Sequence, residues 1–173
     1  LLLRLYDPTS GVIRLNGVDI KEYNLHAYRE IFATTFQDFQ IFGMTIKENI
    51  LMGRHYEKAD ELVKEALKKA GVYDKVMTLE NGIDTMMTKE FDENGAVLSG
   101  GETQKIAVAR TFVKEAPMKI FDEPSSALDP IAEFELFQNI MKEETIPKAM
   151  LILAAPSMAT MLCLAFFHIA DTF

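Results

Sequence analysis

The sequence Val97-Leu98-Ser99-Gly100-Gly101-Glu102-Thr103-Gln104 opens a predicted helix that continues through Lys114. Ser99 is a favourable N-cap residue, and the glycines allow a phosphate to approach the backbone closely. The first N–H groups of a helix have no partner within the helix, and the helix dipole favours negative charge there. This stretch therefore predicts a phosphate-binding helix start.

A second stretch, further along the chain, contains residues that could bind a metal ion or act in catalysis. Met118 to Phe121 form a short apolar strand, and the acidic pair Asp122-Glu123 comes directly after it. Asp122 is suited to Mg²⁺, a hard cation that takes oxygen ligands. Extended backbone would turn Glu123 the opposite way, as a base or water-positioning residue requires. The alternative is a polar strand end whose two carboxylates find other partners.

The two stretches together resemble a known family. LSGGETQ resembles the signature motif of ATP-binding cassette (ABC) nucleotide-binding domains, and IFDEPSSALD resembles their Walker B strand and D-loop. The likeness is to bacterial exporter-type transporters and covers roughly residues 1–153. It implies an incomplete α/β cassette of the P-loop NTPase type over residues 1–173. Its core sheet should be mainly parallel, with a helical arm at roughly residues 45–100.

The resemblance also implies roles for individual residues. Glu123 would be the catalytic residue, and Asp122 and Gln37 would hold Mg²⁺. Gln37 ends an apolar run and matches the Q-loop; the alternative, a polar residue at a strand end, is less favoured once the later motifs are considered. The remaining assignments are nucleotide contacts and a dimer interface: Gln37, Ser99, Gly100 and Gly101 for ATP, and Ser126, Ala127, Leu128 and Asp129 for the interface.

The family further implies partners. Two cassettes dimerise head to tail, so Ser99–Gly101 would contact the γ-phosphate of ATP bound by the other cassette. Residues 38–50 resemble the exporter-type contact with a transmembrane domain. The expected location is the cytoplasmic face of the plasma membrane, and the expected cofactors are ATP and Mg²⁺. The net charge of −8 argues against nucleic acid, because neutralising phosphates needs a basic face.

The sequence departs from the family pattern at both ends. No GxxxxGK[ST] phosphate-binding loop occurs, and Leu1 to Leu5 read as the tail of a helix, so the chain is expected to be a fragment truncated before residue 1. Ala155 stands where exporters have a switch histidine, and residues 154–173 form an atypical tail. The isolated chain is therefore expected to be inactive.

Local patterns predict the remaining elements. Asn16-Gly17 suits a tight turn between strands at 12–15 and 18–20, and Asn24 suits the cap of a helix through Ile31. Apolar spacing predicts helices at 57–70, which Gly71 ends, and at 73–79. Two further elements are predicted: a strand at 32–36 and a strand at 150–153. Pro156 argues against a membrane span at residues 149–170.

Three functions are consistent with these observations. The first is the ATP-hydrolysing subunit of an exporter, or a piece of it. The second is a cassette ATPase outside transport, such as a relative that acts in DNA repair or translation. The third is a degenerate, inactive cassette. The exporter-like residues 36–50 and the lack of a long charged coiled-coil insertion favour the first.

Overall fold

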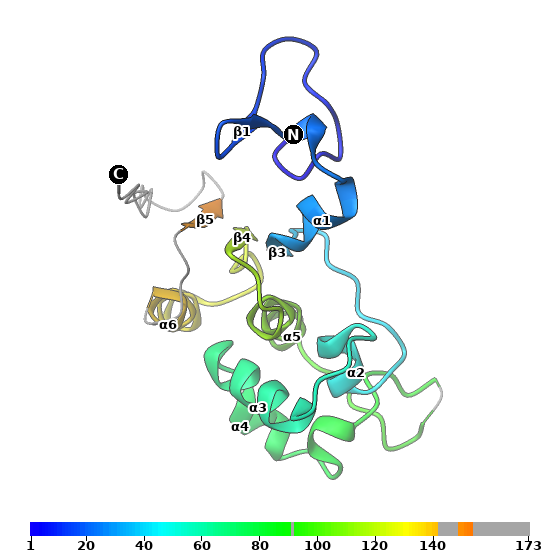
Figure 1. Ribbon diagram of the computed structural model, residues 1–173. Coiled ribbons are helices and arrows are strands. Elements are labelled where there is room, and N and C mark those ends of the chain that lie inside the picture. Colours follow the sequence, from blue (N-terminus) through cyan, green and yellow to red (C-terminus); the bar gives the residue numbers. More distant parts are fainter. Residues whose placement is uncertain (91, 142–148, 154–173) are drawn as a thin grey trace.

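Three parallel strands form the centre of the computed structural model, which describes residues 1–90, 92–141 and 149–153 (Figure 1). They are β3 (Phe32–Thr35), β4 (Met118–Asp122) and β5 (Ala149–Leu153), and β4 lies between the other two. In the register, Thr34 pairs with Ile120 and Phe121 pairs with Ile152. The predicted parallel sheet around the Asp122 strand is therefore confirmed.

Helix α5 (Gly100–Val113) covers one face of this sheet (Figure 1). Apolar side chains surround it on most sides, which is typical of a helix in the middle of a core. The hydroxyl oxygens of Thr35 and Thr111 lie 2.6 Å apart, and the rings of Phe112 and Phe121 are 5.9 Å apart. Helix α6 (Pro130–Met141) contributes Leu136 and Ile140 to the same core.

A layer of short helices packs on α5 on the side away from the sheet (Figure 1). These are α2 (Ile46–Leu51), α3 (Ala59–Lys69), α4 (Tyr73–Met77) and the 3₁₀ turn η2 (Gly82–Asp84). The predicted helices at 57–70 and 73–79 are confirmed with shorter bounds, and Gly71 follows α3 with φ 70°. The prediction that residues 45–100 as a whole form a separate helical arm remains a prediction.

The first 31 residues cover the opposite face of the sheet. β1 (Arg14–Leu15) and β2 (Val18–Asp19) form the predicted hairpin, with φ 51° at Asn16 and 82° at Gly17, as a two-residue turn requires. The 3₁₀ turn η1 (Ile20–Glu22) and helix α1 (Leu25–Glu30) follow. The side chain of Asn24 caps α1 as predicted. A small cluster of Ile20, Tyr28, Phe32 and Ile120 joins this segment to the sheet.

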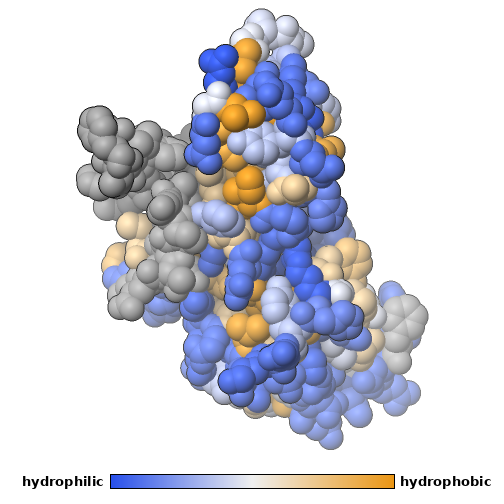
Figure 2. Space-filling view, viewed as in Figure 1, coloured by the Kyte–Doolittle hydropathy of each residue, from blue (hydrophilic) through white to orange (hydrophobic). Residues whose placement is uncertain are grey.

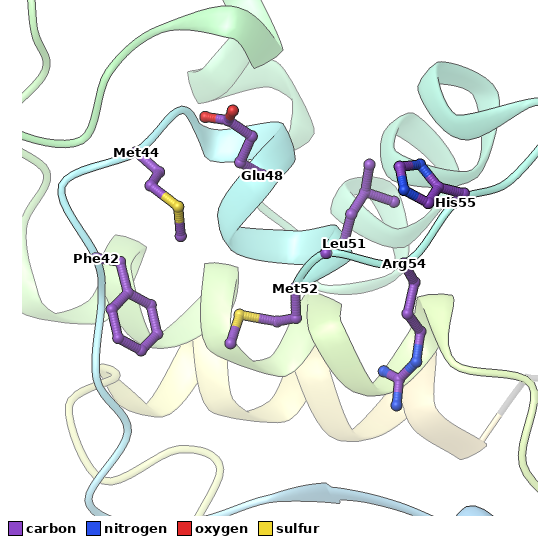
Figure 3. Close-up of a pocket in the computed structure, with 8 residues that line it drawn as sticks. Phe42, Met44, Glu48, Leu51, Met52, Arg54 and His55 are labelled. Atoms are coloured by element: carbon purple, nitrogen blue, oxygen red, sulfur yellow. The ribbon is translucent and has the colours of Figure 1, made fainter.

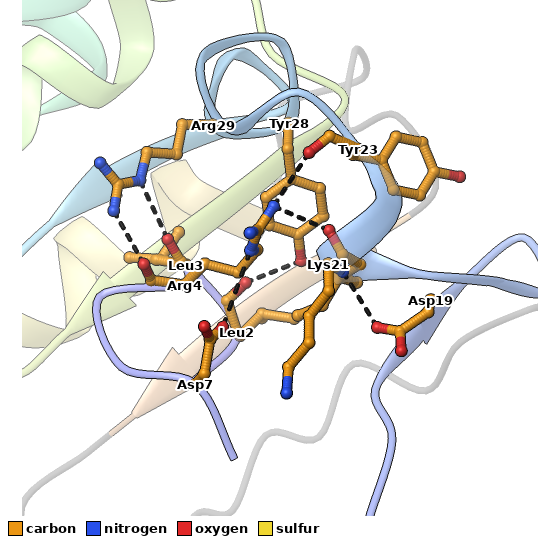
Figure 4. Close-up of polar contacts among 10 residues, drawn as sticks. Leu2, Leu3, Arg4, Asp7, Asp19, Lys21, Tyr23, Tyr28 and Arg29 are labelled. Atoms are coloured by element: carbon orange, nitrogen blue, oxygen red, sulfur yellow. Dashed lines mark hydrogen bonds and ion pairs between the residues drawn. The ribbon is translucent and has the colours of Figure 1, made fainter.

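The predicted helical character of the first residues is wrong. Residues 1–6 form a turn, in which Arg4 has φ 49°. Side chains of α1 bind the carbonyl oxygens that a helix would use: Tyr28 donates to Leu2 at 2.7 Å, and Arg29 donates to Leu3 and Arg4 (Figure 4). Tertiary hydrogen bonds therefore replace the helical ones at these carbonyls.

The surface of the described residues is mixed. Figure 2 shows small hydrophobic patches on one face, while the lower end is mostly hydrophilic. None of the helices in the described ranges has both the length and the apolar character needed to cross a membrane. Ala155, the tail 154–173 and the predicted membrane-span alternative beyond Leu153 lie outside the described residues.

Candidate functional site

The polar residues that end β3 and β4 meet at one edge of the sheet. Gln37 follows β3 and Glu123 follows β4, and neighbouring parallel strands bring their carboxyl ends together. The side-chain nitrogen of Gln37 donates to Oε2 of Glu123 at 2.6 Å, across 86 residues of sequence. Ligands of open α/β sheets bind at this edge, outside the carboxyl ends of the strands.

The backbone of Glu123 differs from the prediction. The strand ends at Asp122, and Glu123 has φ 47°, in the left-handed region rather than in extended conformation. A tight turn follows, because the Ser126 N–H donates to the carbonyl of Glu123 at 3.3 Å. The orientation of Glu123 is therefore set by this turn and by Gln37, not by strand alternation.

The phosphate-binding feature predicted at residues 99–101 is a helix start. Ser99 caps α5, and its hydroxyl accepts from the N–H of Glu102 at 3.2 Å. The carboxylate of Glu102 accepts from the N–H of Ser99 at 2.8 Å, which completes a capping box. Gly100 and Gly101 occupy the first two helical positions, so their N–H groups have no acceptor within the helix.

Glu102 adds a negative charge close to this helix start. Its other oxygen lies 3.6 Å from the ammonium of Lys75 on α4. The hydrogen bond from the Ser99 backbone lowers the pKa of Glu102, and Lys75 acts in the same direction. The capping box and Lys75 therefore hold the carboxylate in its ionised form.

Residues 126–129, predicted as a dimer interface, form a loop between β4 and α6. Asp129 caps α6, and its carboxylate accepts from the N–H groups of Ile131 and Ala132 at 3.0 Å each. Gly101 approaches this loop closely, since a Cβ atom there would stand 2.9 Å from the carbonyl oxygen of Ala127. A Cβ atom at Gly100 would meet nothing nearer than 3.9 Å. The loop and the start of α5 are therefore in direct contact.

The donor set at the sheet edge suits Mg²⁺ only together with a phosphate ligand. Asp122, Glu123 and Gln37 offer the oxygen atoms that Mg²⁺ takes. Within residues 1–90, 92–141 and 149–153, no group of three or more His, Cys, Asp or Glu could hold a metal ion. Mg²⁺ often binds through one or two carboxylates plus substrate phosphates, and these residues fit that pattern.

A groove with an apolar lining lies beside the segment predicted to contact a transmembrane domain. It has a volume of about 390 Å³, and Phe42 and Met52 face each other across it (Figure 3). Asn49, which is fully buried, fixes the groove wall: its amide nitrogen donates to the carbonyls of Phe42, Met44 and Thr45. Arg110 of α5 in turn donates to the Asn49 carbonyl at 2.8 Å.

Sequence reasoning assigned no role to two buried polar residues near the site, Asn49 and Gln104, or to the half-buried Arg110. The last two lie on α5 among apolar residues. A polar residue on an apolar helix face is a signal that could have pointed to them. The partners of Gln104 and Arg110 lie 19 to 61 residues away, so the sequence alone could not identify those partners.

Comparison with known proteins places this geometry in context. The family described as "ABC transporter" matches residues 1–126. The chain is 39% identical over 148 residues to the ATP-dependent lipid A-core flippase of Paraburkholderia xenovorans, which is 84% of this chain and 24% of the flippase. It is 40% identical over 136 residues to the Beta-(1→2)glucan export ATP-binding/permease protein NdvA of Bartonella bacilliformis, which is 79% of this chain and 22% of that protein.

A solved structure shows the same fold. A bacterial Atm1-family ABC exporter with ATP bound superposes with a TM-score of 0.77 and 33% sequence identity, covering 88% of this chain and 26% of the exporter chain. The chain thus spans about a quarter of the length of the relatives that it matches.

Proposed function

Because this chain belongs to the ABC transporter family, we propose that it forms part of the cassette that binds and hydrolyses ATP in an exporter. ATP hydrolysis would then drive movement of a substrate across a membrane. Two relatives, a flippase and an export protein, support an exporter over a cassette ATPase outside transport.

The observation that carries the proposal is the contact between Gln37 and Glu123 at the carboxyl edge of the sheet. In this proposal Glu123 orients or deprotonates the attacking water, and Asp122 and Gln37 hold Mg²⁺. When bound, Mg²⁺ neutralises charge on the phosphates. Gln37 donates to the Glu123 carboxylate through its nitrogen, which leaves its amide oxygen available for the cation.

The start of α5 would serve a second cassette. Ser99, Gly100 and Gly101 would contact the γ-phosphate of ATP held by that partner, in a head-to-tail dimer. Two features support this role: Ser99 and Gly100 are exposed, and the N–H groups of Gly100 and Gly101 have no acceptor within the helix. Residues 126–129, which touch Gly101, would lie in the same interface.

A transmembrane domain would dock at the groove of Phe42 and Met52. Both side chains are exposed, and Asn49 and Arg110 hold the groove against α5. This arrangement would link the membrane domain to the helix that contacts ATP. The cassette would accordingly lie at the cytoplasmic face of the plasma membrane.

The chain alone should bind ATP weakly and should not turn it over, because its sequence contains no GxxxxGK[ST] loop to hold the phosphates. Titration of Mg-ATP into the purified 173-residue chain tests this expectation. Micromolar affinity with steady phosphate release would refute it.

A complementation assay tests the positive part of the proposal. The partner is the cassette of the Atm1-family exporter, carrying an arginine in place of its own signature serine so that its homodimer is inactive. Adding this chain should restore ATP hydrolysis, because Ser99–Gly101 complete the partner's site. The Ser99→Arg variant should not restore it. If the unaltered chain gives no restoration either, the proposed role of Ser99–Gly101 is wrong.

A further inference from the structure

Gln104 connects α5 to the residues that follow β4. Its side chain is 1% exposed, and its amide nitrogen donates to the Glu123 carbonyl at 3.0 Å and to the Ser126 hydroxyl at 2.9 Å. Its amide oxygen accepts from the N–H of Ala127 at 2.8 Å. Because the amide both donates and accepts, no other residue type of this size provides all three contacts.

Apart from Gln104, two sets of described hydrogen bonds anchor the loop between β4 and α6: Gln37 donates to the Glu123 carboxylate at the near end, and the remaining contacts are with α6. There, Ser125 donates to the carboxylate of Glu133 at 2.6 Å, and Asp129 caps α6. Gln104 holds the near end and the middle of the loop, and it holds them to α5 instead of α6. The loop is thus fixed to two helices.

Gln104 also constrains the conformation of Glu123. A residue other than glycine with φ 47° is strained, and it persists only where its surroundings fix it. The Glu123 carbonyl accepts from Gln104 as well as from the turn N–H of Ser126, while its carboxylate accepts from Gln37. Backbone and side chain of Glu123 are therefore held by separate residues.

We propose that Gln104 is a positioning residue that fixes Glu123 and the loop of Ser126–Asp129 relative to the helix start at Ser99–Gly101. Gln104 lies on the same helix as Ser99, so a shift of the helix start on contact with a phosphate would move the loop and Glu123 with it. The geometric part stands on the hydrogen bonds alone. The consequence for hydrolysis rests on the proposed function.

Amide hydrogen exchange of the 173-residue chain, followed by NMR, tests the geometric part. Gln104→Met keeps the length of the side chain and removes all three contacts, so the Ala127 N–H should exchange about tenfold faster. Gln104→Glu keeps an acceptor for Ala127 and should preserve its protection. Gln40→Met, at an exposed amide after β3, is the matched control and should leave the exchange of the Ala127 N–H unchanged.

The N–H of Glu133, which donates to the Asp129 carbonyl, reports on general destabilisation. If Gln104→Met accelerates exchange of Glu133 as much as that of Ala127, the loop is not held specifically and the proposal is wrong. This comparison decides the geometric part even if the Gln104→Glu variant does not fold.

The complementation assay tests the consequence for hydrolysis. Gln104→Met should lower kcat of the restored reaction at least several-fold while KM for Mg-ATP stays unchanged, because the partner's phosphate loop holds the ATP. Restoration equal to that of the unaltered chain would overturn the positioning role. Failure of the unaltered chain to restore hydrolysis would instead contradict the proposed function, and amide exchange would still decide the geometry.

Discussion

At the scale of single residues, the two adjacent glycines of α5 have different surroundings. A Cβ atom at Gly101 would lie 2.9 Å from the Ala127 carbonyl oxygen and 3.1 Å from the Leu128 side chain. The first neighbour is backbone and cannot rotate away. A Cβ atom at Gly100 would reach only ordinary contact with Ala127, at 3.9 Å. Phosphate access alone therefore does not explain Gly101, which is also needed for packing.

We expect Gly101→Ala to be less stable than Gly100→Ala by about 1–3 kcal/mol, the usual cost of overpacking. Both variants gain the same kind of helix propensity, so their difference isolates the contact with the loop. Urea unfolding of the two variants measures it. Equal stability of the two would contradict the close approach of α5 to Ala127.

The lowered pKa of Glu102 predicts how the stability of the chain depends on pH. The capping box and Lys75 lower the pKa of Glu102 from the ordinary value of 4.5. Its stabilising effect should thus be complete above that value and should be lost as the pH falls through the lowered pKa. Glu102→Gln keeps an oxygen acceptor but has no charge to titrate.

The difference in the free energy of unfolding between the unaltered chain and Glu102→Gln should be constant at neutral pH. It should shrink as the pH falls below 4.5. Urea unfolding at a series of pH values checks this expectation. The carboxylate of Glu93, which is exposed, provides a matched control through Glu93→Gln. A difference that stays unchanged into acid would show that the capping box does not perturb Glu102.

At the scale of elements, the contact between β3 and α5 contains one buried polar pair. The hydroxyls of Thr35 and Thr111 lie 2.6 Å apart in a core that is otherwise apolar at this point. Removing one hydroxyl leaves the other without this partner, whereas removing both leaves an apolar contact of the same shape.

Thr35→Val and Thr111→Val should each destabilise the chain by about 1–2 kcal/mol, while the double variant should be close to the unaltered chain. A double-mutant cycle in urea provides the measurement. Additive losses in the double variant would mean that each hydroxyl has a separate partner, which would contradict this assignment.

Local signals predicted most elements correctly. Asn16-Gly17, Asn24 and Ser99 set turns and caps through contacts with residues no more than a few positions away, so neighbouring sequence contains the cause. The carboxyl-edge pair of Gln37 and Glu123 could also be expected, because parallel strands align their ends.

The errors and omissions have tertiary causes. Leu1 to Leu5 have a helical composition, but the side chains of Tyr28 and Arg29 bind the carbonyls of this segment. The left-handed backbone of Glu123 is likewise held by distant residues: its carbonyl accepts from Gln104 and its carboxylate accepts from Gln37. Neither set of contacts is encoded in neighbouring sequence, so pattern reading could not find them.

At the scale of the whole molecule, the sheet separates two hydrophobic clusters. The larger one joins α2, α3, α4, α5 and α6, with Phe121 of β4 pointing into it. The smaller one contains Ile20, Tyr28, Phe32 and Ile120. Neighbouring residues of β4 thus belong to different clusters. The proposed contacts with ATP held by a partner cassette and with a membrane domain involve α5 and α2, so they depend mainly on the larger cluster.

We expect the two clusters to open separately, because the smaller one depends on few contacts between its segment and the rest of the chain. Tyr28→Phe removes the hydrogen bond to the Leu2 carbonyl, which should weaken the smaller cluster by about 0.5–1.5 kcal/mol. The N–H groups of Ile20 and Ile31 should then exchange faster, and that of Ala70 after α3 should not.

Val76→Ala, in the larger cluster, is the reciprocal variant. It should accelerate exchange of the Ala70 N–H but leave exchange of the Ile20 N–H unchanged. Uniform acceleration of all three amides by either variant would mean that the chain unfolds as one unit. The segment of residues 1–31 and the face that carries α5 would then not be independent in stability.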